Sequence, residues 1–277
     1  MEINNVLRKY NFRFKKSLGQ NFISDTGLLE AIVKDADIQN NDLVLEIGAG
    51  AGTLTRALTQ KAEKVIAFDV DEALGPILAE NLTGIDNVEV YFRDILKMSD
   101  DELAEITEGK RFKVVANLPY YITTPLIMRF IESNLPVDSL TVMVQKEVAD
   151  RLTARASTPE YGAITLAVKL RGETKVVRKV SRNMFFPAPN VDSAVIHIVI
   201  NSEFDQSEQT KTLKRLIKAG FAMRRKTLAN NIAAAFPVSK QRAAELIKES
   251  GLNEQIRGEA LTLEDYKLIV SKLLSSK

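Results

Sequence analysis

The sequence predicts an α/β fold, with a Rossmann-like doubly wound sheet followed by a small all-helical C-terminal domain. Short apolar segments alternate with helical patterns over the first half of the chain, which is typical of parallel strands joined by helices. The predicted strands are 43–47, 65–68, 88–92, 112–116 and 140–144. Beyond residue 210 only helical periodicity is left, at 211–221, 227–235, 239–249 and 263–274.

Helical patterns between these strands complete the alternation. They are predicted at 26–37, around the inward-facing Leu54 and Leu58, at 71–81 and at 124–133. Residues 161–170 fit a strand or a helix equally well. Two late strands, 175–180 and 191–200, are predicted to follow the parallel core.

The segment 201–210 is polar and lacks periodicity, so it is predicted to be a linker. It would separate a large first domain, 1–200, from a helical domain, 211–277. The first domain begins with a basic segment, 1–25, that carries spaced aromatic residues.

The composition excludes several classes of site. The chain has 277 residues and no Cys, so disulfides, zinc–thiolate sites and Cys nucleophiles are ruled out. No apolar run approaches the roughly 18 residues of a membrane span, and no apolar signal core follows the basic N-terminus. We therefore expect a soluble cytoplasmic protein. The only histidine, His197, lies in an apolar strand; we interpret it as structural and expect no transition-metal site.

The distribution of charge is more informative than the formal net charge of +2. Residues 211–244 contain no acid, yet this segment carries nine bases: Lys211, Lys214, Arg215, Lys218, Arg224, Arg225, Lys226, Lys240 and Arg242. A long segment of one sign in a nearly neutral protein favours a polyanion such as nucleic acid as partner. A solvated helix face is the alternative.

A glycine-rich segment follows the first predicted strand. Gly48, Gly50 and Gly52 are spaced as G-x-G-x-G, which differs from the G-x-G-x-x-G of dinucleotide sites. Glycines at this position let the backbone approach a ligand closely. The acidic Glu46 beside them suits a cationic ligand such as S-adenosylmethionine. By itself the motif leaves a methyltransferase and a dinucleotide enzyme both open.

Two acidic residues end the next two predicted strands. Ligands of open α/β sheets bind at the carboxyl ends of the strands. Asp69 stands 21 positions after Gly48, where a carboxylate can accept hydrogen bonds from both ribose hydroxyls. Because Asp71 is the better candidate for a helix N-cap, we assign Asp69 to the ribose. Asp94, after the third strand, can accept from an adenine amine of the cofactor. Asn117, at the end of the fourth strand, is also counted among the cofactor-binding residues.

The motif Asn117-Leu118-Pro119-Tyr120 ends the fourth predicted strand. The exocyclic amine of adenine is a poor nucleophile, because its lone pair is delocalised into the ring. The side-chain oxygen of Asn117 and the backbone carbonyl of Leu118 can bind the two amine hydrogens and turn the lone pair toward a methyl donor. Tyr120 can stack on an extruded base. The motif therefore indicates methyl transfer to adenine, with a structural Asn-Pro turn as the alternative.

At this motif the chain resembles the KsgA-type small-subunit ribosomal RNA adenine dimethyltransferases. The resemblance covers nearly the whole length, so it implies the class I methyltransferase form of the sheet. The motifs that carry it are Lys16–Phe22, Glu46–Gly50, Asn117–Tyr120, Phe185–Ser193 and Arg224–Leu228. One mild departure is Asp69, where many members have Glu.

The resemblance implies further roles. Gln20 and Asn21 would belong to a segment that closes over the cofactor, and Phe185 would face Tyr120 across the target adenine. The family dimethylates two adjacent adenines in a hairpin near the 3′ end of 16S RNA, late in small-subunit assembly. Its helical C-terminal domain helps to hold RNA, which points to Arg224, Arg225 and Lys226. We expect a monomer that needs no metal.

Other interpretations stay open at this point. The macrolide-resistance methyltransferases, which modify a 23S adenine, share the fold and a similar motif; the Arg224–Leu228 run and the 257–268 segment favour the small-subunit enzymes. DNA adenine and protein glutamine methyltransferases usually carry a second proline where Leu118 stands. A role as a ribosome-assembly factor, with catalysis secondary, would accompany the methyltransferase activity and does not compete with that interpretation. A nicotinamide oxidoreductase is disfavoured by the glycine spacing.

Overall fold

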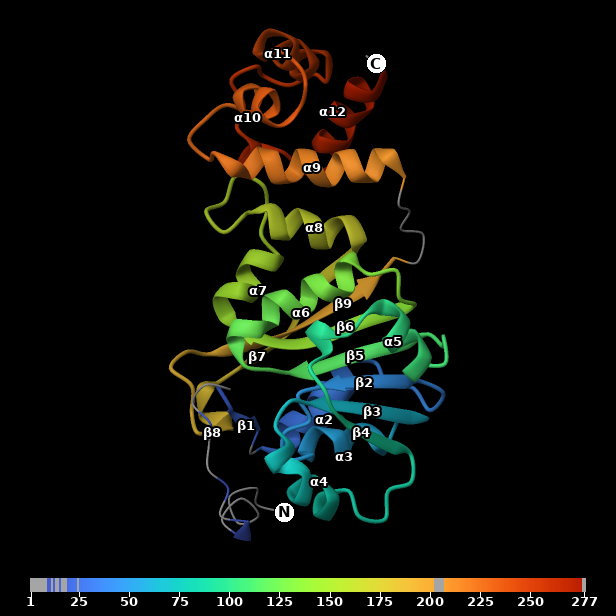
Figure 1. Cartoon of the computed structure of the whole chain (residues 1–277). Helices are drawn as coiled ribbons and strands as arrows, with labels where there is room; N and C mark the ends of the chain where they lie inside the picture. The colour runs from blue at the N-terminus through green and yellow to red at the C-terminus, as the bar shows by residue number, and fades with distance from the viewer. Residues whose placement is uncertain are drawn as a thin grey trace. The chain divides into compact units, whose positions relative to one another are not determined.

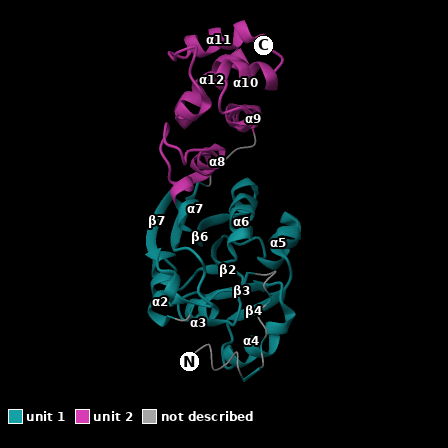
Figure 2. Ribbon diagram, turned by 90° about the vertical axis from the view of Figure 1, so that its left-hand side faces the viewer, with its two compact units in different colours: residues 1–149, 174–202 teal, residues 150–173, 203–277 magenta. Residues whose placement is uncertain are grey.

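The computed structural model describes residues 9, 10, 12, 15, 19–23, 25–201 and 207–275. The described residues form two compact units (Figure 2). Unit 1 runs to Ala149 and resumes at Thr174, up to residue 201. Unit 2 consists of Asp150–Glu173 and the described residues from Ser207 onward.

A seven-stranded sheet forms the centre of unit 1 (Figure 1). Its strand order is β4-β3-β2-β5-β6-β9-β7, and the pairs among β4, β3, β2, β5 and β6 are parallel. Strand β9 pairs antiparallel with β6. The bounds are β2 Leu43–Ile47, β3 Lys64–Asp69, β4 Val88–Phe92, β5 Phe112–Asn117, β6 Val137–Gln145, β7 Gly172–Val180 and β9 Ser193–Ile200. The predicted α/β class is confirmed. Strand β2, inside the sheet between β3 and β5, ends where the glycine-rich segment begins.

Helices cover both faces of this sheet, as a doubly wound fold requires. On one face α2 and α3 pack on Val44, Val65 and Val115. On the other face Phe112 of β5 meets Phe130 of α6 edge to face, with 6.2 Å between ring centroids. The bounds are α2 Thr26–Asp35, α3 Thr53–Thr59, α4 Gly75–Asn81, α5 Asp100–Ile106, α6 Tyr120–Glu132 and α7 Lys146–Leu152.

A small second sheet joins two segments that are far apart in sequence. Strand β1, Phe22–Ile23, pairs antiparallel with β8, Phe185–Phe186, so that Phe22 lies opposite Phe186 and Ile23 opposite Phe185. Two-residue strands carry no periodicity, so the sequence did not predict this pairing. It brings the end of the N-terminal segment to the segment that contains Phe185.

Unit 2 is built mainly of helices and has a core of its own. Its helices are α8 Ala163–Arg171, α9 Glu208–Ala222, α10 Leu228–Ala235, α11 Lys240–Glu249 and α12 Leu263–Ser275. The ambiguous segment 161–170 is therefore helical from Ala163 onward. Tyr161 and Leu166 are buried in the same core as Leu216 and Ile269, and the Tyr161 hydroxyl donates to the Leu261 carbonyl at 2.7 Å.

The compact units divide the chain differently from the predicted boundary at 200. Residues 150–173 belong to unit 2 because the apolar side chains around Tyr161 pack on the C-terminal helices. Helix α9 begins three residues before the predicted 211, since the Ser207 side chain accepts from the Thr210 amide and caps it. The predicted linker, 201–210, lies partly outside the described residues.

Unit 2 depends on a close approach at Gly220, which predicts a measurable loss of stability in Gly220→Ala. A Cβ at Gly220 would lie 2.1 Å from the Tyr266 hydroxyl, and that hydroxyl donates to the Gly258 carbonyl at 3.0 Å. Alanine normally stabilises a helix by about 1 kcal/mol over glycine. Here overpacking should outweigh that gain and lower the free energy of unfolding by about 1–3 kcal/mol. Urea unfolding measures it.

Gly162→Ala is the matched control for this prediction, because Gly162 lies in the same unit and no described atom approaches its Cβ position within 4 Å. Equal stability of both variants and the parent chain would contradict the proposed role of Gly220.

Candidate active site

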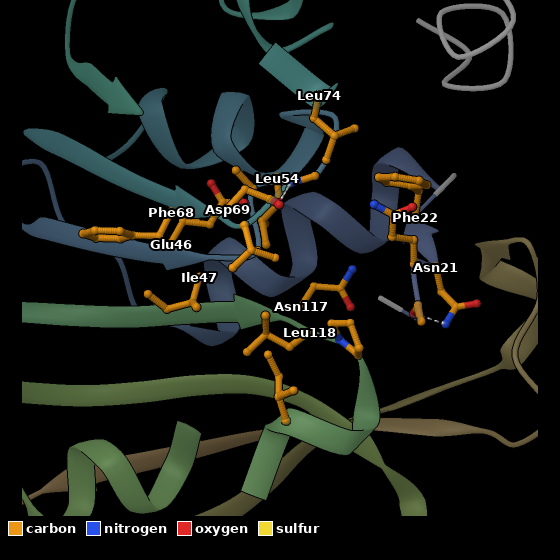
Figure 3. Close-up of a pocket in the computed structure, with 18 of the residues that line it drawn as sticks. Asn21, Phe22, Glu46, Ile47, Leu54, Phe68, Asp69, Leu74, Asn117 and Leu118 are labelled. Atoms are coloured by element: carbon orange, nitrogen blue, oxygen red, sulfur yellow. Dashed lines mark hydrogen bonds between the residues drawn. The ribbon is translucent and has the colours of Figure 1, made fainter. Parts of the chain in front are cut away.

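A pocket in unit 1 opens at the carboxyl ends of the parallel strands (Figure 3). Its volume is about 1050 Å³, counted with its solvent-filled mouth. All the residues that the sequence assigned to the cofactor or to the target base line it: Gln20, Asn21, Glu46, Gly48, Gly50, Asp69, Asp94, Asn117, Leu118, Tyr120 and Phe185. The fold therefore gathers into one space residues that are up to 165 positions apart, from Gln20 to Phe185.

The conformation of the glycine-rich loop after β2 is fixed in part by contacts with neighbouring residues of the protein. Gly48 has a φ of +82°, and a Cβ there would lie 2.7 Å from Cδ2 of Leu118. Its amide donates to the Phe68 carbonyl at 2.8 Å. Any larger residue at this position would therefore be strained by the positive φ and would push the Leu118 side chain aside.

Asp69, at the end of β3, holds this loop. Its Oδ2 accepts from the Gly50 amide and its Oδ1 from the Asp71 amide, both at 2.8 Å. Burial raises the pKa of Asp69, while these backbone hydrogen bonds oppose the shift. Each oxygen has a second lone pair, so the carboxylate can still accept from a ligand. Asp71 was predicted to cap the following helix, and its side chain does cap the short 3₁₀ turn Glu72–Leu74.

Asp94 also has a local structural role. It caps the 3₁₀ turn Ile95–Lys97, accepting from the Leu96 amide at 3.1 Å, and its Oδ2 lies 3.4 Å from the Lys97 ammonium. The sequence assigned it only to a ligand. Its position in the pocket wall is compatible with both roles, because a carboxylate offers about four acceptor sites.

Glu46 is the most unusual group in the pocket wall. It is fully buried in β2, and among the described residues neither of its oxygens has a hydrogen bond of ordinary geometry. Burial raises its pKa from 4.5 to about 8; the nearby Thr55 lowers it and the charge of Asp69 raises it further. A buried carboxyl without a partner is costly to a folded protein. A positively charged ligand in this pocket would offset that cost.

The turn after β5 presents two uncommitted acceptors. Within the described part of the chain, neither the Asn117 side chain nor the Leu118 carbonyl has a hydrogen-bond partner, and both residues line the pocket. In Figure 3 Asn117 lies between Asp69 and Leu118. Pro119 precedes α6 and contributes no amide hydrogen. This arrangement can bind a planar group that carries two hydrogens on one nitrogen.

Tyr120 is held beside these acceptors by a residue whose role the sequence did not predict. Its hydroxyl lies 2.8 Å from Oγ of Ser193, at the start of β9. Burial raises the pKa of Tyr120; the hydrogen bond with Ser193 opposes this shift, and the charge of Asp192 adds to it. Ser193 stands in the Phe185–Ser193 motif, so this contact joins that motif to the Asn117–Tyr120 motif.

Phe185 lines the pocket but is packed more deeply than a free stacking residue. Only 5% of it is exposed, and it belongs to the same apolar cluster as Ile23 and Val195. Its neighbour Phe186 is 41% exposed. The structure thus places Phe185 in the wall that the predicted target base would meet.

The predicted closing segment is attached to Asp71. The Gln20 side chain accepts from the Lys15 amide at 3.0 Å and donates to Oδ2 of Asp71 at 2.9 Å. The Lys15 ammonium contacts Oδ1 of Asp71 at 2.5 Å. Asn21 donates to the Gly19 carbonyl at 3.0 Å. Gln20 therefore fixes the segment through its amide, a role that the sequence did not distinguish from ligand contact.

The basic triplet Arg224, Arg225 and Lys226 lies in unit 2, between α9 and α10, and is exposed. Arg224 pairs with Glu259 at 3.2 Å and donates to the Pro159 carbonyl at 3.3 Å, so it is partly structural. No ion pair engages Arg225 or Lys226 among the residues described.

His197 stands outside the pocket, in β9. Its Nδ1 lies 2.8 Å from the Thr141 hydroxyl, and burial lowers its pKa. Within the described ranges no group of three or more His, Cys, Asp or Glu side chains is placed to hold a metal ion. The same residues include no helix long and apolar enough to cross a membrane.

Comparison with known proteins identifies the family. The model of the ribosomal RNA adenine dimethylases matches residues 11–273. The chain belongs to the ribosomal RNA adenine dimethylase family. It is 44% identical to the ribosomal RNA small subunit methyltransferase A of Clostridioides difficile, covering 98% of this chain and 94% of that one. With the protein of the same name from Lachnoclostridium phytofermentans the identity is 46%, over 94% and 92% of the two chains.

Solved structures agree with this membership. A dimethyladenosine transferase from Plasmodium falciparum matches 91% of this chain and 96% of its own, with a TM-score of 0.78 and 26% identity. The 23S rRNA methyltransferase ErmE matches with a TM-score of 0.71 at 24% identity, which shows a shared fold. The family predicted from the sequence motifs is confirmed, and the chain is a methyltransferase by its membership.

Proposed function

We propose that this adenine dimethylase modifies small-subunit RNA. It transfers methyl groups to the exocyclic amines of two adjacent adenines in a hairpin near the 3′ end of 16S RNA, forming N6,N6-dimethyladenosine during small-subunit biogenesis in the cytoplasm. The names of the curated relatives support the small-subunit substrate. The structural observation that carries the proposal is the pair of uncommitted acceptors, on Asn117 and Leu118, beside Tyr120.

The pocket fits S-adenosylmethionine, which supplies an activated methyl group on a cationic sulfur. Asp69 has free acceptor capacity for ribose hydroxyls, and Asp94 for an adenine amine. The buried carboxyl of Glu46, which accepts no hydrogen bond of ordinary geometry from the described residues, favours a cation over a neutral ligand. The glycine loop, with Gly48 and Gly50, forms part of the pocket wall. Gln20 holds the N-terminal segment against Asp71 at the edge of this site.

The chemistry at the target follows from orientation. An adenine amine whose hydrogens are bound by the Asn117 oxygen and the Leu118 carbonyl directs its nitrogen lone pair away from both acceptors. Tyr120 and Phe185 hold the ring. Methyl transfer breaks the carbon–sulfur bond of the sulfonium, and the thioether leaves as a neutral molecule that needs no proton. The methylated amine is left positively charged and strongly acidic, so it loses one proton to water, and no side chain has to act as a strong base beforehand. Proximity and orientation therefore supply most of the acceleration.

The alternative substrate is a 23S adenine, as in the macrolide-resistance enzymes. The shared fold with ErmE allows it, whereas the small-subunit names of relatives at 44–46% identity favour 16S RNA. Mass spectrometry of 16S and 23S RNA from cells with and without the protein distinguishes the two substrates. Loss of dimethyladenosine from 16S RNA alone is expected, and loss from 23S RNA alone would favour the alternative.

RNA binding is expected to depend strongly on salt through the basic surface of unit 2. Arg225→Ala with Lys226→Ala is the informative variant, because Arg224 also pairs with Glu259 and its loss would disturb the fold. Removing the charge that meets one phosphate should flatten the slope of log affinity against log salt by about one unit. Filter binding to small-subunit particles at several salt concentrations measures the slope.

The matched control replaces two exposed lysines of unit 1, Lys34 and Lys61, by alanine. An unchanged slope in the Arg225–Lys226 variant would show that this pair does not bind RNA phosphates.

We further propose that the protein acts as a monomer on the assembled subunit or its precursor.

A further inference from the structure

The most exposed large apolar side chain in the described part of the chain lies at the active-site pocket. Tyr121 is 61% exposed and lines this pocket, directly after the Tyr120 that faces the predicted target base. Val70, the next most exposed at 54%, lines the same pocket from the end of β3. Single exposed apolar side chains are common on proteins. Two of them at one pocket indicate a surface that a ligand covers.

The backbone of α6 separates the two neighbouring tyrosines. Successive residues of a helix leave its axis roughly 100° apart. Tyr120 therefore turns inward, where its hydroxyl meets Ser193 at 2.8 Å, and Tyr121 is left in solvent. The Tyr121 hydroxyl has no hydrogen-bond partner among the described residues. The side chain is thus not needed for the hydrogen bonding of the fold.

One edge of the Tyr121 ring is nevertheless supported. A Cβ at Gly19 would lie 3.8 Å from Cε1 of Tyr121 and 3.2 Å from Cβ of Pro119. Gly19 itself has a φ of +55°, a conformation that favours glycine. Gly19 of the N-terminal segment therefore lies beside one edge of the ring, while most of the ring surface stays accessible. A rigid aromatic ring of this kind can stack on a base at a low cost in conformational entropy.

We propose that Tyr121 is a stacking platform for the base next to the target adenine, in an unpaired segment of RNA. This inference rests on the proposed function. When one of two adjacent adenines occupies the pocket beside Asn117, the neighbouring base is tethered at the mouth, where Tyr121 lies. Every base has a π face, so the contact requires an unpaired neighbour but no particular sequence. A base held in a duplex stack cannot make it.

The proposal makes Tyr121 a positioning residue that selects an unpaired target, separate from the residues that bind the reacting adenine. Loss of the ring should weaken RNA binding and slow methyl transfer to the bound adenine. It should not change cofactor affinity or the stability of unit 1, since the ring is mostly outside the core.

The test is a double-mutant cycle between protein and RNA. Small-subunit particles are reconstituted with 16S RNA in which one of the two adjacent adenines is replaced by an abasic nucleotide. Methylation of the remaining adenine is followed in single turnovers. For the wild-type protein the abasic change should lower kcat/KM by about 5- to 150-fold, the range of base–aromatic stacking. Tyr121→Ala should lose a similar factor on intact RNA and be insensitive to the abasic change.

Two further variants complete the design. Tyr121→Phe keeps the ring and should behave as wild type, and Val199→Ala removes a 51% exposed side chain outside the pocket and should change nothing. Independent, multiplicative losses from Tyr121→Ala and from the abasic change would overturn the stacking proposal while leaving methylation itself intact. Absence of methylation on intact particles by the wild-type protein would contradict the proposed function, and the stacking proposal with it.

Discussion

Asn117→Ala is expected to slow methyl transfer by about 10²- to 10³-fold, the loss typical of removing one preorganised polar group from an active site. The Asn117 oxygen is proposed to orient the target amine only when base and methyl donor are aligned. Its removal should therefore lower the single-turnover rate and leave the affinity for S-adenosylmethionine nearly unchanged. Rapid quench with chromatography of the nucleosides gives the rate, and calorimetry gives the affinity.

The matched control is Asn40→Ala, at an exposed position outside the pocket. A normal rate in Asn117→Ala would refute the catalytic role of this residue. A large loss of cofactor affinity without loss of rate at saturation would assign Asn117 to the cofactor instead. Both acceptors are expected to matter most in the first transfer, because a monomethylated amine has one hydrogen left.

Glu46→Gln is expected to stabilise the protein at neutral and alkaline pH. The folded protein holds the Glu46 proton up to a pKa of about 8, whereas the unfolded chain releases it near 4.5. Between these values the folded state binds more protons, so the free energy of unfolding falls as pH rises. At pH 7, which lies 2.5 pH units above 4.5, this effect lowers the free energy of unfolding by about 3 kcal/mol, at about 1.36 kcal/mol for each pH unit. Glutamine, which does not ionise, should recover most of it.

Urea unfolding at pH 4.5 and pH 8 measures this effect. The stabilisation by Glu46→Gln should be absent at the lower pH and largest at the higher one. Glu30→Gln, at an exposed position of α2, should show no such dependence. A pH-independent difference between Glu46→Gln and wild type would show that ionisation of Glu46 does not limit stability.

The same substitution should weaken cofactor binding. A cation in the pocket favours the ionised carboxylate, so the affinity of wild-type protein for S-adenosylmethionine should rise between pH 6.5 and pH 8.5. Glu46→Gln should bind more weakly at the higher pH and lose this dependence. A residue that destabilises the fold would then be explained by its contribution to binding, as is common at active sites.

Much of the architecture could be predicted from the sequence, because the parallel strands are short, apolar and separated by helical patterns. The pocket was predictable for a related reason. Its residues stand where strands end, and the carboxyl ends of parallel strands meet at one edge of the sheet. Asp69 and Asn117 could be assigned to a common site from this rule alone.

Other features depend on contacts that no local pattern records. The pairing of β1 with β8 involves two residues on each side and leaves no periodic signal. Residues 150–173 join unit 2 because Tyr161 is buried among helices that lie well beyond it in the sequence. The burial of the Glu46 carboxyl and the attachment of Gln20 to Asp71 depend on which side chains surround them after folding.

The central claim is that this chain dimethylates adjacent adenines of 16S RNA. The most direct test is a time course with purified wild-type protein, S-adenosylmethionine and partly assembled small subunits that lack the modification. Large subunits lacking 23S methylation serve as the competing substrate. We expect transient N6-methyladenosine and then N6,N6-dimethyladenosine at two adjacent positions of 16S RNA. Methylation confined to 23S RNA, or a reaction that stops at N6-methyladenosine, would contradict the account.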